Sequence, residues 1–125
     1  MTTKINLRRI PYFRDNPIVV QRLTAHFQIH HDFMVHQLAI ATGCKLEEAL
    51  SICFLLYHHN QAEIYILYSR DDLAINPFWK SKLSEGYPSL PLYSVDNDVE
   101  IESLDGVKYD FWLVLNQTNN FLFEI

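Results

Sequence analysis

A lone glycine between two segments of helical periodicity constrains the fold of this chain more than any other feature. Before Gly43, apolar residues recur at helical spacing over residues 33–41, and after it they recur over residues 46–59. Glycine readily takes the left-handed backbone conformation that ends a helix. We therefore expect a short helix that starts after a cap at Asp32, a tight turn at Gly43, and a longer helix packed against the first.

The residues on either side of this glycine resemble a helix-turn-helix motif, which spans residues 35–53. Leu38 would anchor the first helix, and Ala39 is small at the point where two helices approach closely. Ala49 and Ile52 would place apolar side chains of the second helix against the first. The resemblance implies a DNA-reading or a protein-docking module, because winged helices serve in both roles. A plain pair of packed helices joined by a glycine is the alternative.

The flanking segments extend the resemblance to the winged-helix version of the motif, over residues 17–69. A helix is expected over residues 17–29, after a cap at Asp15 or Asn16 and with a proline at its first position. Residues 63–68 are rich in β-branched and aromatic side chains, which favours a strand. The predicted fold class is α+β: a winged-helix-like part of three helices, followed by a small antiparallel β-sheet or hairpin.

The C-terminal part has the alternation typical of strands. Residues 99–102 and residues 107–115 alternate in polarity, and the dipeptide Asp105-Gly106 between them is a strong hairpin signal. The alternation places Trp112 on the face opposite Phe111. A hairpin of these two strands is therefore expected, with the C-terminal hairpin of a winged helix as its analogue.

The remaining segments have weaker patterns. Residues 1–15 are expected to be extended, and a turn at Asn119-Asn120 is expected before a last strand over residues 121–125. Three prolines and a glycine mark turns in the long connection between the two strand regions, where residues 78–83 are expected to cover the core as one helical turn.

A chain of 125 residues is expected to form one domain. It divides into a basic N-terminal segment (1–16), the helix-turn-helix core with its first strand (17–69), an irregular connection (70–98), and a hairpin with a last strand (99–125).

The charge is distributed unevenly along the chain. The formal net charge is −5, but residues 1–22 hold five basic side chains against one acidic one, while residues 23–79 and 80–125 are both acidic. A domain that grips a phosphate backbone usually carries net positive charge. The balance therefore favours a protein partner over nucleic acid.

The function that we expect is that of a non-catalytic protein-interaction module, an adaptor or accessory subunit that binds a protein partner or a second copy of itself. Two acids open the second helix of the motif, two more lie on one strand face, and tryptophan is a common interface anchor. Packing of the tryptophan in a core is the alternative. The candidate partner-binding residues are Glu47, Glu48, Trp112, Glu100 and Glu102.

A DNA-binding transcriptional regulator is the alternative function. Its support is the helix-turn-helix resemblance together with the basic N-terminal segment, which would contact phosphates as an arm and a helix face. The candidate nucleic-acid-binding residues are Arg8, Arg9, Arg14, Arg22 and Lys45. A solvated surface is the plainer interpretation of these five side chains.

The sequence predicts no catalytic residue, no cofactor, no metal site and no evident small-molecule substrate. His26 and His30 share a helix face, but no third ligand accompanies them. Cys44 and Cys53 are about 13 Å apart along a helix, too far for a disulfide. Reduced cysteines and the lack of an apolar signal sequence predict a cytoplasmic protein, and the apolar runs are too short for a membrane span.

Overall fold

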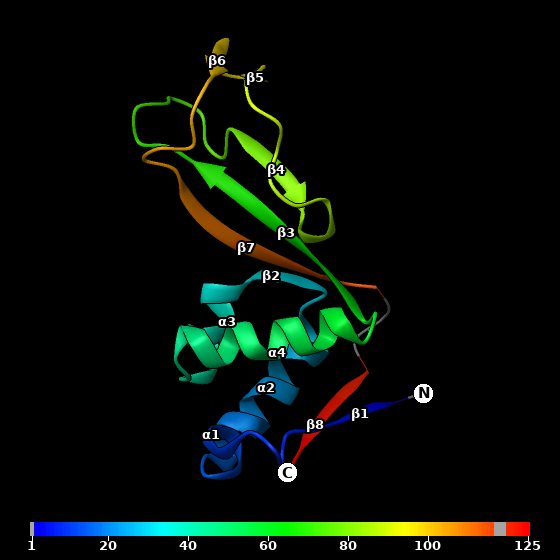
Figure 1. Cartoon of the computed structure of the whole chain (residues 1–125). Helices are drawn as coiled ribbons and strands as arrows, with labels where there is room; N and C mark the ends of the chain where they lie inside the picture. The colour runs from blue at the N-terminus through cyan, green and yellow to red at the C-terminus, as the bar shows by residue number, and fades with distance from the viewer. Residues whose placement is uncertain (1, 117–119) are drawn as a thin grey trace.

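Helices and strands intermix along the whole chain in the computed structural model, which describes residues 2–116 and 120–125 (Figure 1). The fold is mixed α+β, with antiparallel pairing in its main sheet. In chain order, the elements are β1 (Thr3–Asn6), α1 (Pro11–Arg14), α2 (Pro17–Ile29), β2 (Asp32–Met34), α3 (Val35–Thr42), α4 (Leu46–His58), β3 (Ala62–Ser69), β4 (Trp79–Lys82), the 3₁₀ turn η1 (Leu83–Glu85), β5 (Leu92–Ser94), β6 (Val99–Ile101), β7 (Lys108–Leu115) and β8 (Phe121–Glu124).

Two helices form around Gly43 and meet at a tight turn, as predicted, although the first starts at Val35 and not after Asp32. Gly43 ends α3 in the left-handed conformation, with φ of 77°, and its N–H donates to the carbonyl of Ala39 at 2.9 Å. Ala49 and Ile52 of α4 are fully buried. The predicted helix over residues 17–29 is also confirmed, because α2 has these bounds.

The strand β2 corrects the prediction that a helix starts at Asp32. Residues 32–34 pair with β7, and Phe33 packs edge-to-face on Phe27 with the ring centroids 5.0 Å apart. Tertiary pairing overrides the local helical periodicity here. The predicted run of three helices is therefore interrupted by a strand.

The N-terminal segment is also more structured than predicted. Strand β1 precedes every helix and pairs in parallel with β8, so the first and last described strands lie side by side (Figure 1). Residues 11–14 form the short helix α1, with Pro11 at its first position and Phe13 buried. The prediction of extended chain is wrong at these four residues, because proline at that position loses no helical hydrogen bond. Asn16, one of the predicted caps of α2, makes no side-chain capping bond and donates its amide to the Tyr12 carbonyl instead.

The main sheet has the strand order β2-β7-β3-β4, and all its pairs are antiparallel. Its central pair, β3 and β7, joins eight residue pairs from Ala62↔Leu115 to Ser69↔Lys108. The face that carries Ile64 and Leu113 packs on the helices, and both side chains are buried in their core. We call this the inner face and the opposite one the outer face.

The predicted hairpin at Asp105-Gly106 does not form. Strand β6 pairs with β5, whereas β7 has β2 and β3 as its neighbours. The dipeptide still lies in a turn, closed by the Val107 N–H on the Leu104 carbonyl. β3 pairs with β7 over its whole length on one side, β2 pairs with residues 112–114 on the other side, and β6 pairs with β5.

The connection over residues 70–98 holds β4, η1 and β5, and it is more regular than predicted. The helical turn expected over residues 78–83 is wrong, because residues 79–82 form an edge strand against β3. The last strand is confirmed as β8. Of the turn predicted at Asn119-Asn120, Asn119 lies outside the described residues.

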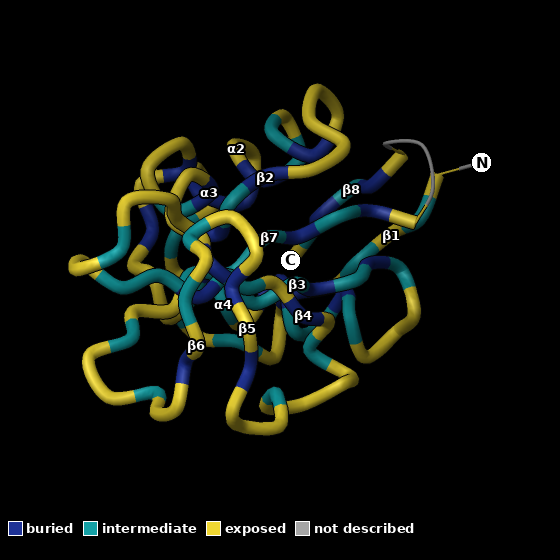
Figure 2. Tube along the Cα trace, turned by 90° about the horizontal axis from the view of Figure 1, so that it is seen from above, coloured by how far each residue is buried: buried dark blue, intermediate teal, exposed yellow. Residues whose placement is uncertain are grey.

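Two hydrophobic clusters form the core. The larger one joins the helices, β1, β8 and the adjoining half of the sheet. The smaller one is built on Tyr68, Phe78, Leu92 and Ile101, and lies under the β5-β6 hairpin. Figure 2 shows buried segments along β3 and β7 with exposed loops around them.

The described helices include none that is both long and apolar enough to cross a membrane.

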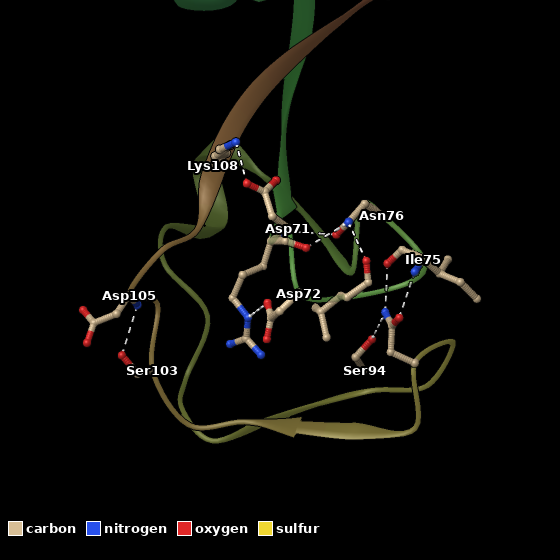
Figure 3. A network of polar contacts seen from close by, with 11 residues as sticks. Asp71, Asp72, Ile75, Asn76, Ser94, Ser103, Asp105 and Lys108 are labelled. Atoms are coloured by element: carbon tan, nitrogen blue, oxygen red, sulfur yellow. Dashed lines mark hydrogen bonds and ion pairs between the residues drawn. The ribbon is translucent and has the colours of Figure 1, made fainter.

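Side-chain amides tie the loops around the smaller cluster together (Figure 3). Asn76 accepts a bond from the Arg70 N–H and donates to the Arg70 carbonyl, and Asn97 does the same for Ile75. Lys108 pairs with Asp71 at 2.8 Å. The Asn97 bonds hold the β3–β4 connection against the β5-β6 hairpin, and the Lys108–Asp71 pair ties it to β7.

Candidate interaction site

An apolar groove of about 490 Å³ opens on the inner side of the sheet, beyond the helices. It lies between α4, the distal parts of β3 and β7, and the segment after η1. Its lining residues are Phe54, Ile66, Leu83, Gly86, Tyr87, Tyr109 and Phe111. We call this set the apolar groove.

The floor of the groove follows from strand alternation. Ile66 and Phe111 are cross-strand partners on the inner face, next to the pair Tyr68 and Tyr109. Tyr109 packs edge-to-face on the buried Tyr68, with the ring centroids 5.2 Å apart. The helices cover the sheet only at its other end, so this part of the inner face stays open.

One wall of the groove comes from α4. Leu46, Leu50 and Phe54 are spaced four residues apart and form one stripe along this helix. Leu46 at the start of the stripe is 51% exposed, whereas Leu50 and Phe54 are half-buried. The apolar surface therefore continues from the groove along the helix.

The other wall and the rim come from the segment around η1. Leu83 is half-buried, but Tyr87 is 79% exposed and Tyr109 opposite is 44% exposed. Desolvation raises the pKa of Tyr109, with smaller contributions from Tyr87 and Tyr68. The Tyr109 phenol therefore stays neutral at physiological pH and can both donate and accept a hydrogen bond.

The chemistry of the lining is that of a binding site. The seven lining residues include no acid, no base and no thiol. They offer apolar surface with two phenol hydroxyls at the rim, each able to donate and accept a hydrogen bond. Such a site takes apolar side chains and orients them by few polar contacts.

Trp112, a predicted partner-binding residue, lies on the outer face, opposite the groove. It is half-buried, and its ring centroid is 5.1 Å from that of Tyr65. Its indole N–H donates to the Asp32 carboxylate at 2.9 Å. The Lys80 ammonium lies over both rings, 5.2 Å from the Trp112 centroid and 5.5 Å from the Tyr65 centroid.

The four predicted acidic residues lie on two distant elements. Glu47 and Glu48 are in the first turn of α4, and Glu100 and Glu102 are exposed at β6, at the far end of the molecule (Figure 1). One carboxylate oxygen of Glu48 is buried without a hydrogen-bond partner in the described structure. The structure does not join these acids to each other or to Trp112.

The predicted basic residues gather loosely around α1, α2 and the Gly43 turn. Arg8 and Arg9 are exposed in the turn after β1, and Arg14 is exposed beside Asp15 at 3.8 Å. Arg22 donates to the Thr42 carbonyl at the end of α3, at 3.5 Å, and Lys45 is exposed at the N-cap of α4. Arg22 and Lys45 therefore both flank the Gly43 turn.

Of the histidines, His26 is half-buried and the other five are exposed, whereas both cysteines are buried. His26 packs against His30 and Phe33, and burial lowers its pKa, with the charge on His30 as a smaller cause. Cys44 and Cys53 are free and buried, and burial raises the pKa of the Cys53 thiol. Within the described part of the chain, no group of three or more His, Cys, Asp or Glu side chains is arranged to hold a metal ion.

The groove was not predicted from the sequence, although part of its signal was present. The stripe Leu46, Leu50 and Phe54 and the alternation through Phe111 were both visible. The contribution of Tyr87 was not, because it depends on how the irregular connection folds back.

Comparison of the chain with protein-family models, with curated proteins and with solved structures finds no match in any of the three.

Proposed function

We propose that this chain is a non-catalytic protein-interaction module, an adaptor or accessory subunit, that binds an apolar segment of a partner protein in the apolar groove. The observation that carries the proposal is the groove itself: a concave site at the surface, lined by apolar and aromatic side chains, with exposed tyrosines on its rim. Exposed concave apolar surface with aromatic anchors is typical of protein-docking sites.

The proposal includes a winged-helix-like arrangement of the scaffold. The order α2, β2, α3, α4, β3, β7, with β7 between β2 and β3 in the sheet, resembles that of winged helices. In DNA-reading members, the second helix of the motif enters the major groove by its N-terminal end. Here that helix is α4, which presents Glu47 and the exposed Leu46 at this end. Acidic and apolar side chains favour a protein partner over phosphates.

The charge near the groove suggests the chemistry of the partner. Glu47 is seven residues before Phe54, so both lie on the same face of α4, about 10 Å apart along its axis. A segment that fills the groove and continues along the Leu46 stripe would pass this carboxylate. We therefore expect the partner to be a short segment with two or three apolar anchors and basic flanks, the mode in which amphipathic helices bind grooves.

A peptide selection tests this function. Displayed random peptides are selected on the full chain, and the binding of the selected peptides is measured by calorimetry on Tyr87→Ala and on Tyr93→Ala. Tyr87 lies on the rim of the groove, whereas Tyr93 is another exposed tyrosine, on β5 outside it. We expect Tyr87→Ala to weaken binding about tenfold or more and Tyr93→Ala to leave it unchanged. Equal binding to both variants would refute docking in the groove.

DNA binding is the second candidate, favoured by the position of Arg22 and Lys45 on either side of the Gly43 turn. A mobility-shift assay at increasing salt tests it. Binding that weakens steeply with salt, and that is lost on Arg8→Ala with Arg9→Ala, would support a DNA-binding regulator. Failure to bind DNA at low salt would leave the protein-docking function as the proposal.

A further inference from the structure

The centre of the outer face of the sheet is an apolar row that belongs to neither hydrophobic cluster. The register aligns Met34, Trp112 and Tyr65 across β2, β7 and β3, and alternation puts Leu67 and Val114 on the same face. All five side chains are half-buried. Among the described residues, neither cluster counts any of them as a member. The sheet therefore presents a second apolar surface, away from the helices and away from the apolar groove.

Charges border this row with opposite signs on its two sides. Asp32 on β2 and Asp110 on β7 are acidic, and Lys80 and Lys82 on the other edge strand, β4, are basic. The register shows that all four point to the outer face: Lys82 is opposite Tyr65, Lys80 is opposite Leu67, and Leu67 is opposite Asp110. Among the described residues of these strands, two depart from this gradient: Glu63 on β3, which is acidic, and Lys108 at the end of β7, which is basic and pairs with Asp71. Asp110 also contacts the His36 ring of its own chain at 3.2 Å.

This gradient makes the face complementary to itself. Consider a two-fold axis in the plane of the interface, parallel to the strands and between β7 and β3. Rotation about this axis places the β4 edge of one copy over the β2 edge of the other. Lysines then face aspartates on both sides, as an isologous contact requires. The same rotation places Trp112 of one copy against Tyr65 of the other at the centre, where aromatic anchors contribute most.

We propose that the outer face binds the outer face of a second copy of this chain, so that the protein forms a two-fold symmetric homodimer with two stacked sheets. The four aromatic rings form the centre of the interface and the aspartates and lysines form its rim. Lys80, which covers the rings of its own chain, turns toward Asp110 of the other copy. The proposal is independent of the proposed function, because the groove opens on the inner side.

The size of the face sets the expected strength of the dimer. Strand spacing makes the face about 14 Å wide between its edge strands, and the eight-residue pairing makes it about 27 Å long. It therefore offers on the order of 400 Å² per copy, less than the roughly 800 Å² per partner of a standard interface. We expect a reversible dimer that dissociates in the micromolar range.

Charge-swap complementation tests the proposal by sedimentation velocity from about 1 µM to about 1 mM. Asp32→Lys and Lys82→Asp alone each create like-charge contacts and are expected to weaken the dimer about tenfold or more. An equimolar mixture of the two single variants restores both attractive contacts, so dimers should return in the mixture. Asp15→Lys makes the same charge change beside α1, outside the sheet, and should not alter the dimer.

A second swap keeps the test informative if Asp32→Lys perturbs the fold by removing the acceptor of the Trp112 indole. Asp110→Lys and Lys80→Asp form the next row and are expected to behave in the same way, with far-UV circular dichroism as the check on folding. A chain that stays monomeric over the whole concentration range overturns the proposal. So does a dimer whose affinity the single variants leave unchanged, or that neither mixture restores.

Discussion

Replacement of Gly43 by alanine probes the turn on which the helical part depends. At φ of 77°, an L-residue carries a backbone strain of about 1–2 kcal/mol. A Cβ at this position would also lie 3.2 Å from Nη1 of Arg22. The Arg22 side chain would have to move, and its bond to the Thr42 carbonyl would be lost or lengthened. That bond is long and only partly buried, so its loss adds at most about 0.5 kcal/mol.

We therefore expect Gly43→Ala to lower the free energy of unfolding by about 1–2.5 kcal/mol, measured by urea unfolding and checked by calorimetry. For a chain of this length, that corresponds to a fall in Tm of roughly 4–10 °C. The helical content of the folded protein should stay unchanged, because the strain is confined to one residue.

Gly106→Ala is the matched control. Gly106 has nearly the same φ, 74°, but a Cβ there meets no atom within 4 Å. Gly106→Ala should show the backbone strain alone, and Arg22→Ala combined with Gly43→Ala should remove the part due to the contact. A neutral Gly43→Ala alongside a destabilising Gly106→Ala would refute the reasoning, since both positions require the left-handed conformation.

Four further predictions concern the core and its titratable groups. Phe27→Ala removes a fully buried ring that packs on Phe33 and Phe123, and it should lower the free energy of unfolding by about 3–5 kcal/mol in urea; a loss below about 1 kcal/mol would contradict this packing. Thr24→Val removes the hydroxyl that accepts the Phe123 N–H at 2.9 Å, and a loss of about 1 kcal/mol is expected by the same assay. Because the pKa of His26 is lowered on folding, its contribution to stability is complete above about pH 6.5 and declines as the pH falls toward its folded pKa. His26→Gln should therefore flatten the dependence of the free energy of unfolding on pH below about pH 6.5. An unaltered dependence would exclude His26 as its cause. Burial and a raised thiol pKa should keep Cys53 from reacting with a thiol reagent near pH 8 until the protein unfolds, so rapid labelling of the folded Cys44→Ser variant would contradict its position.

The sequence was sufficient for the elements whose signals are local. The proline that opens α2, Gly43 at the end of α3 and the apolar spacing along α4 act through short-range sterics and periodicity. The helices α2 and α4 and the end of α3 were accordingly predicted correctly. Strand alternation also placed Trp112 and Phe111 on opposite faces of β7, as the register confirms. In each case, the residues that determine the structure are neighbours in the sequence.

The errors share a different cause, which is pairing between segments far apart in the chain. Phe33 joins a strand because Leu113, eighty residues later, lies opposite it. The Asp105-Gly106 turn does not produce a hairpin of its two flanking strands, because β6 pairs with β5 and β7 pairs with the distant strand β3. The apolar groove was missed for the same reason, since Tyr87 reaches it only through the fold of the connection before β5. Long-range competition of this kind leaves little trace in local periodicity.

Strand β7 has a consequence for how variants of this protein should be interpreted. Its odd-numbered residues serve the groove and the core, and its even-numbered residues serve the outer face, so two surfaces are encoded in one stretch of eight residues. Insertion or deletion of one residue within this strand would exchange the two sets, turning Trp112 inward and Phe111 outward. A one-residue insertion or deletion would therefore abolish both surfaces at once, although it hardly changes the composition. An insertion or deletion of two residues would leave each remaining side chain on its original face.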